Sequence, residues 1–273
     1  MGAARRLLVL LFAVLLPSLA VLLLMASMQT DLLFPTHAVP AAGPLPPAAE
    51  RLQVTTKGGE TLHGVYLPPT AQEAGPKTLI LGFGGNAWNA QHVAEYLHDA
   101  LPEAHVVAFH YRGYRPSTGS PSAEALLEDA PLVLRAASDR VQPDRIVVVG
   151  FSIGSGVAAS LARQPGVDGV VLVTPFDSLK AVAAELYPWL PIGPFFRHEI
   201  DTAAFLRDAQ APVAIIAAER DEIIPTSRTE ALRPQVSNLL LDRTIEGAGH
   251  NDIYGRGDFQ QALREAVVAV AVK

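Results

Sequence analysis

The pentapeptide Gly150-Phe151-Ser152-Ile153-Gly154 contains the residue types that point most directly to chemistry. A serine hydroxyl becomes a good nucleophile when a sharp turn exposes it and a neighbouring base can remove its proton. Two glycines flank Ser152, an aliphatic run at 146–149 precedes it, and Val157-Ala158-Ala159 follows. This order predicts a strand, a tight turn and a helix, with Ser152 as the nucleophile of an acyl-transfer reaction.

A serine nucleophile needs a histidine base and an acid that orients it. We expect both on loops that follow later strands. Asp221 follows the apolar run 212–218, and His250 lies in a glycine-rich loop after 239–245, so these two residues are predicted to complete the triad. Glu219 and Glu222 are nearby substitutes for the acid. Asp177, after an earlier strand, is the alternative acid.

The oxyanion of an acyl-transfer intermediate needs two backbone N–H donors. The residue after the nucleophile, Ile153, is expected to supply one of them. The loop Gly84-Gly85-Asn86 follows another predicted strand, and Asn86 is expected to supply the second.

Several other kinds of chemistry are disfavoured. Gly154-x-Gly156-x-x-Ala159 resembles a dinucleotide fingerprint, but it begins four residues beyond the strand end, so close helix packing is the preferred interpretation. The chain has no cysteine, and its eight histidines form no metal-binding pattern, so neither a cofactor nor a metal is expected. The net charge of −6, without a basic cluster, gives no indication of a nucleic-acid partner.

The elements that must position these residues alternate along the chain. Continuous aliphatic runs such as 146–149 and 170–173 are typical of strands buried on both faces of a parallel sheet. Gly58-Gly59 predicts a leading antiparallel hairpin. The expected fold class is therefore α/β, a mostly parallel, doubly wound sheet. The strands are expected at 52–57, 61–67, 78–83, 106–110, 145–150, 167–174, 212–218 and 239–245. The helices are expected near 88–100, 122–138, 153–163, 226–234 and 253–272.

The N-terminus reads as a membrane segment. Arg5 and Arg6 precede the uncharged stretch Leu7–Met28, and ~20 apolar residues suffice to span a bilayer. No lysine or arginine follows until Arg51, which predicts an extracytoplasmic catalytic body. The alternative is a signal peptide cleaved after Ala20, which would release a secreted protein. The predicted organisation is a transmembrane signal anchor at 1–30, a proline-rich linker at 31–50 and a catalytic domain at 51–273.

With these residues in view, the chain resembles the bud-emergence-type α/β-hydrolases, which are membrane-anchored serine hydrolases. The resemblance covers roughly residues 31–273. It implies an α/β-hydrolase fold and activity on esters. The motifs that carry it are Asp31–Pro35, Phe83–Asn89, Tyr111–Tyr114, Ser117–Ser122, Leu127–Ala130, Gly150–Gly154, Thr174–Leu179 and Gly249–Asp252.

The chain departs from the family pattern at three places: Gly84 replaces a histidine, Trp88 replaces a glycine, and Arg115-Pro116 follows Tyr114 where a glycine is usual. Trp88 is therefore expected to narrow or line the acyl pocket, and packing of the following helix is the alternative for this residue. The aromatic, proline-rich stretch 186–196 is expected to form a small cap over an apolar site, with Tyr187 and Trp189 as candidate substrate contacts. Packing on the domain flank is the alternative for that stretch.

The expected function is a membrane-anchored serine hydrolase that cleaves a carboxylic ester or thioester with an apolar, lipid-like acyl group. A serine peptidase on the same fold is one alternative. A non-catalytic, membrane-tethered binding protein is the other.

Overall fold

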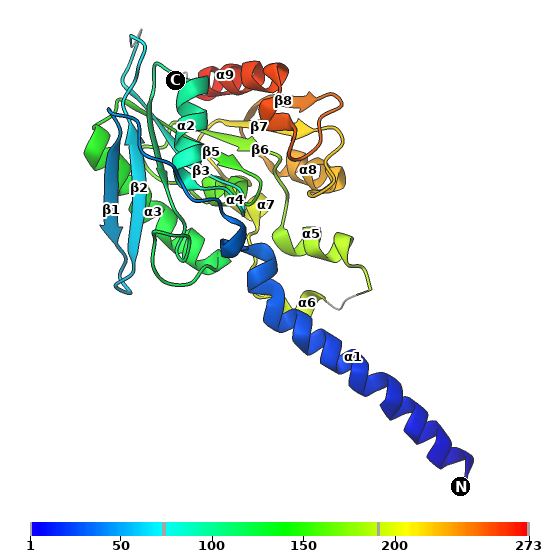
Figure 1. Ribbon diagram of the computed structural model, residues 1–273. Helices are drawn as coiled ribbons and strands as arrows, with labels where there is room; N and C mark the ends of the chain where they lie inside the picture. The colour runs from blue at the N-terminus through cyan, green and yellow to red at the C-terminus, as the bar shows by residue number, and fades with distance from the viewer. Residues whose placement is uncertain (1, 73–74, 190–191, 272–273) are drawn as a thin grey trace.

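A computed structural model describes residues 2–72, 75–189 and 192–271 of the chain (Figure 1). Its centre is an eight-stranded sheet in the order β1-β2-β4-β3-β5-β6-β7-β8. The strands are β1 (Glu50–Thr55), β2 (Thr61–Leu67), β3 (Thr78–Phe83), β4 (His105–Phe109), β5 (Arg145–Phe151), β6 (Gly169–Val173), β7 (Val213–Ala218) and β8 (Leu239–Ile245). β1, β2 and β4 pair antiparallel, and every pairing from β4 to β8 is parallel.

The mostly parallel α/β sheet and its antiparallel start are those predicted. The first strand begins and ends two residues earlier than expected, because the hairpin turn occupies residues 56–60. In that turn Thr56 N–H donates to the Glu60 carbonyl, and Gly59 has a φ of 92°. Such a backbone conformation suits glycine and ends the strand before Lys57.

Helices cover both faces of the sheet, as in a doubly wound fold (Figure 1). They are α2 (Ala90–Ala100), α3 (Ala123–Val141), α4 (Ile153–Ser160), α5 (Leu179–Leu186), α6 (Ile192–Phe195), α7 (Thr202–Leu206), α8 (Thr226–Leu232) and α9 (Gly257–Ala271). Alternate residues of a strand face opposite sides of a sheet. On β5, accordingly, Val148 joins the core under α3 and α4, whereas Val147 and Val149 join the core under α2 and α9.

The chain begins with the long helix α1 (Ala3–Leu33), which extends away from the sheet (Figure 1). The transmembrane helix predicted for residues 1–30 is not found, since no helix in the described ranges is both long enough and apolar enough to cross a membrane.

The proline-rich segment after α1 lies against the domain. Phe34 is only 1 % exposed and belongs to the main core. The Asn89 side chain donates to the Pro40 carbonyl at 3.0 Å, and the Gln91 side chain donates to the Gly43 carbonyl. This segment therefore connects α1 to the sheet along the protein surface.

Candidate active site

Ser152 lies between β5 and α4, with φ 53° and ψ −121°. A non-glycine residue adopts positive φ at a cost of order 1–3 kcal/mol, and such strain is typical of functional positions. The flanking glycines make the turn sterically possible. A Cβ on Gly150 would overlap the carbonyl of Gly154, and a Cβ on Gly154 would overlap the backbone of Phe83. The motif thus forms the predicted tight turn, with Ser152 at its apex.

Gly156 has a packing role of the same kind. A Cβ there would overlap the Ile200 side chain and approach the Thr202 hydroxyl. The glycines at 154 and 156 therefore let α4 approach its neighbours closely, which agrees with the packing interpretation rather than a dinucleotide loop.

The structure brings Ser152, His250 and Asp221 into one hydrogen-bonded chain. His250 Nε2 lies 3.0 Å from Ser152 Oγ, and His250 Nδ1 lies 2.9 and 2.8 Å from the two carboxylate oxygens of Asp221. An ionised carboxylate only accepts, so Nδ1 carries the proton and Nε2 is left to accept from the serine hydroxyl. Backbone N–H groups of Ile223 and Ile224 donate to Asp221 and fix it. The arrangement is suited to proton removal from Ser152.

The alternative acids have other partners. One Asp177 oxygen accepts from the backbone of Ser178, and the other lies 3.4 Å from Arg228. Glu219 accepts from Gly247 N–H, and Glu222 accepts from the backbone N–H of His250 at 3.0 Å. Of the four carboxylates, Asp221 is the one whose oxygens lie beside the His250 ring nitrogen.

The loop Gly84-Gly85-Asn86 lies beside the nucleophile. A Cβ on Gly85 would be 3.7 Å from the Ser152 Cβ, in ordinary contact. Ile153 begins α4, and the first N–H groups of a helix have no partner within it. Asn86 and Ile153 both line the cavity that contains Ser152, which is where the two predicted oxyanion donors are needed.

Two tyrosine hydroxyls donate hydrogen bonds to backbone carbonyls of this loop. Tyr111 donates to the Gly84 carbonyl and Tyr114 donates to the Asn86 carbonyl, each at 2.7 Å. The Trp88 N–H donates to the Gly85 carbonyl. These bonds fix the carbonyls of successive peptides and so fix the direction of the N–H groups between them. In the sequence, Tyr111–Tyr114 is one of the motifs that carry the family resemblance, and no local pattern indicates its contact with this loop.

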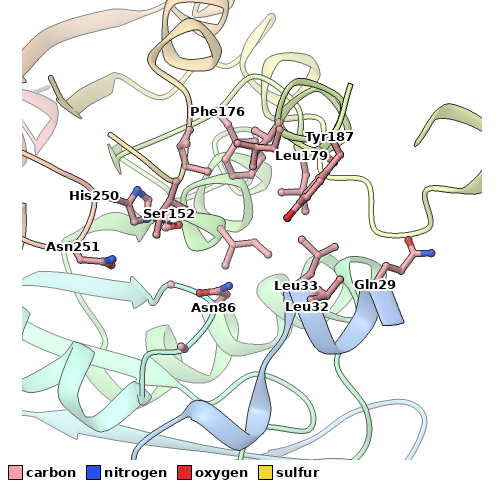
Figure 2. A pocket seen from close by; sticks show the side chains of 18 of the residues that line it. Gln29, Leu32, Leu33, Asn86, Ser152, Phe176, Leu179, Tyr187, His250 and Asn251 are labelled. Atoms are coloured by element: carbon pink, nitrogen blue, oxygen red, sulfur yellow. Dashed lines mark hydrogen bonds between the residues drawn. The ribbon is translucent and has the colours of Figure 1, made fainter. Parts of the chain in front are cut away.

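A cavity of about 570 Å³ opens beside Ser152 and His250 (Figure 2). Its wall is mostly apolar and is formed by the loop 84–86, called the oxyanion loop below for its predicted role, by α1, and by α5 and α6, called the cap below. The lining residues include Leu32, Leu33, Trp88, Phe176, Leu179, Val182, Leu186, Tyr187, Ile192, Phe196, Ile223, Ile224 and Tyr254. A cavity of this size and character suits a small apolar ligand.

Of the three predicted substrate contacts, two line the cavity. Trp88 lines the cavity and packs edge-on against Phe151, 5.1 Å between ring centroids. Tyr187 lines it too. Trp189 is not among the lining residues that the structure describes; it is 65 % exposed and contacts Tyr187 edge-on. Leu190 and Pro191 of the predicted cap lie outside the described residues.

Sequence reasoning missed most of the apolar wall. The spacing of Leu179, Val182, Ala183 and Leu186 is that of one helix face and could have indicated a lining helix. The contribution of α1 had no local signal. Within residues 2–72, 75–189 and 192–271, no group of three or more histidine or acidic side chains is placed to hold a metal ion.

Comparison with known proteins gives a consistent result. Residues 79–201 match a family model described as alpha/beta hydrolase fold. The uncharacterized protein Rv2307c of Mycobacterium tuberculosis is 35% identical over 223 residues, covering 78% of each chain. The protein bem46 of Schizosaccharomyces pombe is 30% identical over 186 residues, covering 64% of this chain and 62% of its own.

The lysophosphatidylserine lipase ABHD12 of Danio rerio is 31% identical over 139 residues, covering 44% of this chain and 36% of its own. Among solved structures, the esterase Pf2001 of Pyrococcus furiosus superposes with a TM-score of 0.65 at 19% identity. That match covers 86% of this chain and 97% of the esterase. The structural similarity supports the fold. The sequence similarity to the curated relatives indicates common descent with them.

Proposed function

Because this chain belongs to the α/β-hydrolase fold family, we propose that it is a serine hydrolase that cleaves a carboxylic ester or thioester. The observation that carries the proposal is the hydrogen-bonded chain from Ser152 through His250 to Asp221, which opens onto an apolar cavity. The resemblance to a lysophosphatidylserine lipase supports a lipid-like ester as the substrate class.

In the proposed reaction His250 Nε2 takes the hydroxyl proton as Ser152 Oγ attacks the acyl carbon. The carbonyl oxygen becomes an oxyanion, held by the N–H groups of Ile153 and Asn86. His250 then gives the proton to the leaving alkoxide or thiolate, so the alcohol or thiol departs and the acyl group stays on Ser152. Asp221 keeps the imidazole in the orientation that both transfers need.

Hydrolysis of the acyl-enzyme repeats these steps with water. His250 removes a proton from a water molecule, which attacks the acyl carbon through the same oxyanion geometry. The ester bond to Ser152 breaks, His250 returns the proton to Oγ, and the carboxylic acid leaves.

The wall of the cavity favours an ester over a peptide. A peptidase that recognises a free amino terminus needs an acidic anchor near the scissile bond. In the part of the chain that the structure describes, the cavity is lined by no Asp or Glu, and its polar lining includes Gln29, Asn86 and Asn251. This composition supports an uncharged acyl chain.

A fluorophosphonate probe together with p-nitrophenyl ester turnover tests the proposal. Wild-type protein is expected to be labelled and to hydrolyse the ester, and Ser152→Ala is expected to abolish both. Ser155→Ala is the matched control, because Ser155 is a buried serine three residues away whose hydroxyl donates to the Ser152 carbonyl. A Ser152→Ala protein that labels and turns over like wild type contradicts the assignment. Wild type that never labels favours a binding protein.

We also propose that the protein works at the outer face of a membrane. Arg5 and Arg6 lie in the first turns of α1, and no lysine or arginine follows until Arg51. Leu10, Leu16 and neighbouring apolar residues of α1 are more than half exposed, and exposed apolar patches mark interaction sites. Cell fractionation with a C-terminal reporter tests this, and N-terminal sequencing shows whether the chain is cleaved after Ala20. A reporter active only in the cytoplasm contradicts the outward orientation.

A further inference from the structure

The C-terminal turn of α1 forms one wall of the cavity. Gln29, Leu32 and Leu33 lie on one side, facing the cap residues Leu179 and Tyr187 across the cavity (Figure 2). Ser152 and His250 lie at the other end of this space (Figure 2). The last turn of α1 thus lines the cavity at the end away from Ser152 and His250.

This end of α1 is fixed to the segment that follows the cap. Thr30 Oγ1 hydrogen-bonds His198 Nε2 at 2.8 Å, and Arg197 N–H donates to the Gln29 side-chain oxygen at 2.9 Å. The Phe34 ring meets the His198 ring edge-on, 5.2 Å between centroids, and both residues are buried. Three separate contacts therefore hold the helix end in one position relative to the cap.

The side chains of the cavity wall at this end of α1 favour a hydrocarbon ligand. Leu32 and Leu33 line the cavity together with leucine and valine side chains of α5 and with Tyr187. The cavity volume of about 570 Å³ lies within the range of ~300–1,000 Å³ usual for small-molecule sites. Leu32 is nevertheless 57 % exposed. It therefore lies where the cavity meets solvent, toward the end of the cavity away from Ser152 (Figure 2).

We propose that the last turn of α1 determines acyl-chain specificity: Leu32 and Leu33 contact the distal carbons of a long, single acyl chain whose carbonyl lies at Ser152. This inference rests on the proposed ester hydrolysis and adds the substrate class. Chains too short to reach α1 lose this contact, so the protein prefers long-chain esters over acetate.

Steady-state hydrolysis of p-nitrophenyl acetate and p-nitrophenyl dodecanoate by the full chain in detergent tests the inference. Wild type is expected to have the higher kcat/KM on dodecanoate. Leu32→Asp places a charge beside the chain and is expected to lower that kcat/KM about tenfold, while hydrolysis of acetate changes little. Leu32→Met, which keeps an apolar side chain of similar size, is expected to retain the wild-type ratio.

Leu240→Asp is the matched control. Leu240 is 54 % exposed, close to the value for Leu32, but it lies on the edge strand β8. We expect this variant to keep the wild-type preference. If Leu32→Asp behaves like Leu240→Asp, or if it lowers kcat/KM equally for both esters, the proposal that α1 determines specificity is wrong.

Binding of cis-parinaric acid, a fluorescent long-chain fatty acid, separates this inference from the proposed reaction. Leu32→Asp is expected to raise its Kd about tenfold, and Leu240→Asp to leave it unchanged. Protein that binds the fatty acid through Leu32 but hydrolyses no ester would contradict the proposed function and retain the acyl site. A second outcome would overturn the inference and keep the proposed function: the protein hydrolyses acetate, but the Leu32→Asp variant binds the fatty acid as tightly as wild type does.

Discussion

At the scale of single residues, the acid of the triad gives the sharpest test. Asp221→Asn replaces a carboxylate that only accepts with an amide that can donate to His250 Nδ1, which stabilises the wrong tautomer. We expect kcat on a p-nitrophenyl ester to fall about 10⁴-fold at neutral pH. Asp177→Asn is the control, because Asp177 pairs with Arg228, and it should keep kcat near the wild-type value. A larger loss from Asp177→Asn would make Asp177 the acid.

Tyr114 is expected to act on the reaction through the oxyanion loop. Its hydroxyl donates to the Asn86 carbonyl, and Tyr114→Phe leaves that acceptor without its partner, at a cost of about 1–3 kcal/mol. We expect kcat to fall about tenfold with KM unchanged, since the loop acts on the oxyanion rather than on the bound ester. Fluorophosphonate labelling should slow in parallel.

Tyr66→Phe is the control for that substitution. Tyr66 is also buried and its hydroxyl is bonded to His105, but it lies on β2, which is not adjacent to the strand β3 that leads into the oxyanion loop. Equal losses from Tyr66→Phe and Tyr114→Phe would indicate a general effect on stability and would remove the positioning role of Tyr114.

At the scale of elements, Phe34 links the N-terminal helix to the domain. It is 1 % exposed in the main core, although it lies in the stretch that the sequence predicts to be a linker. Phe34→Ala is expected to lower the free energy of unfolding by about 3–5 kcal/mol, through lost burial and the cavity left behind. Denaturant titration measures this, and Leu240→Ala, at an exposed position, should change it by no more than about 0.5 kcal/mol. A Phe34→Ala protein as stable as the control would show that residues 31–50 do behave as a free spacer.

The sequence predicts the elements that repeat a local rule. β5 and β6 contain the continuous aliphatic runs 146–149 and 170–173, so their place inside a parallel sheet follows from burial on both faces. The sequence predicts Ser152, Asp221 and His250 as one site because each follows a strand, and parallel strands bring their carboxyl ends to one edge. The remaining parts depend on contacts between distant segments. Leu32 reaches the cavity because contacts such as that between Thr30 and His198, 168 residues apart, hold the end of α1, and no local pattern encodes that pairing.

At the scale of the whole molecule, buried His110 makes stability depend on pH. Burial is the largest cause, and together with the neighbouring His63, His92 and Arg51 it lowers the pKa of His110 from 6.5 to about 4. Below pH 6.5 His110 binds a proton in the unfolded chain, whereas in the folded protein it stays neutral until the pH approaches 4. Stability is therefore complete above pH 6.5 and falls as the pH drops towards 4, by up to about 3 kcal/mol.

Denaturant unfolding of wild type and His110→Leu between pH 4 and 7 measures this contribution. The variant places an apolar side chain among Leu62, Phe83 and Phe109, and it should lose most of the acid-induced fall in the free energy of unfolding. Burial also lowers the pKa of His198, so a smaller slope should remain. His37→Leu, at an exposed position, is expected to keep the wild-type slope. An unchanged slope in His110→Leu would mean that the protons taken up on acid unfolding bind elsewhere in the chain.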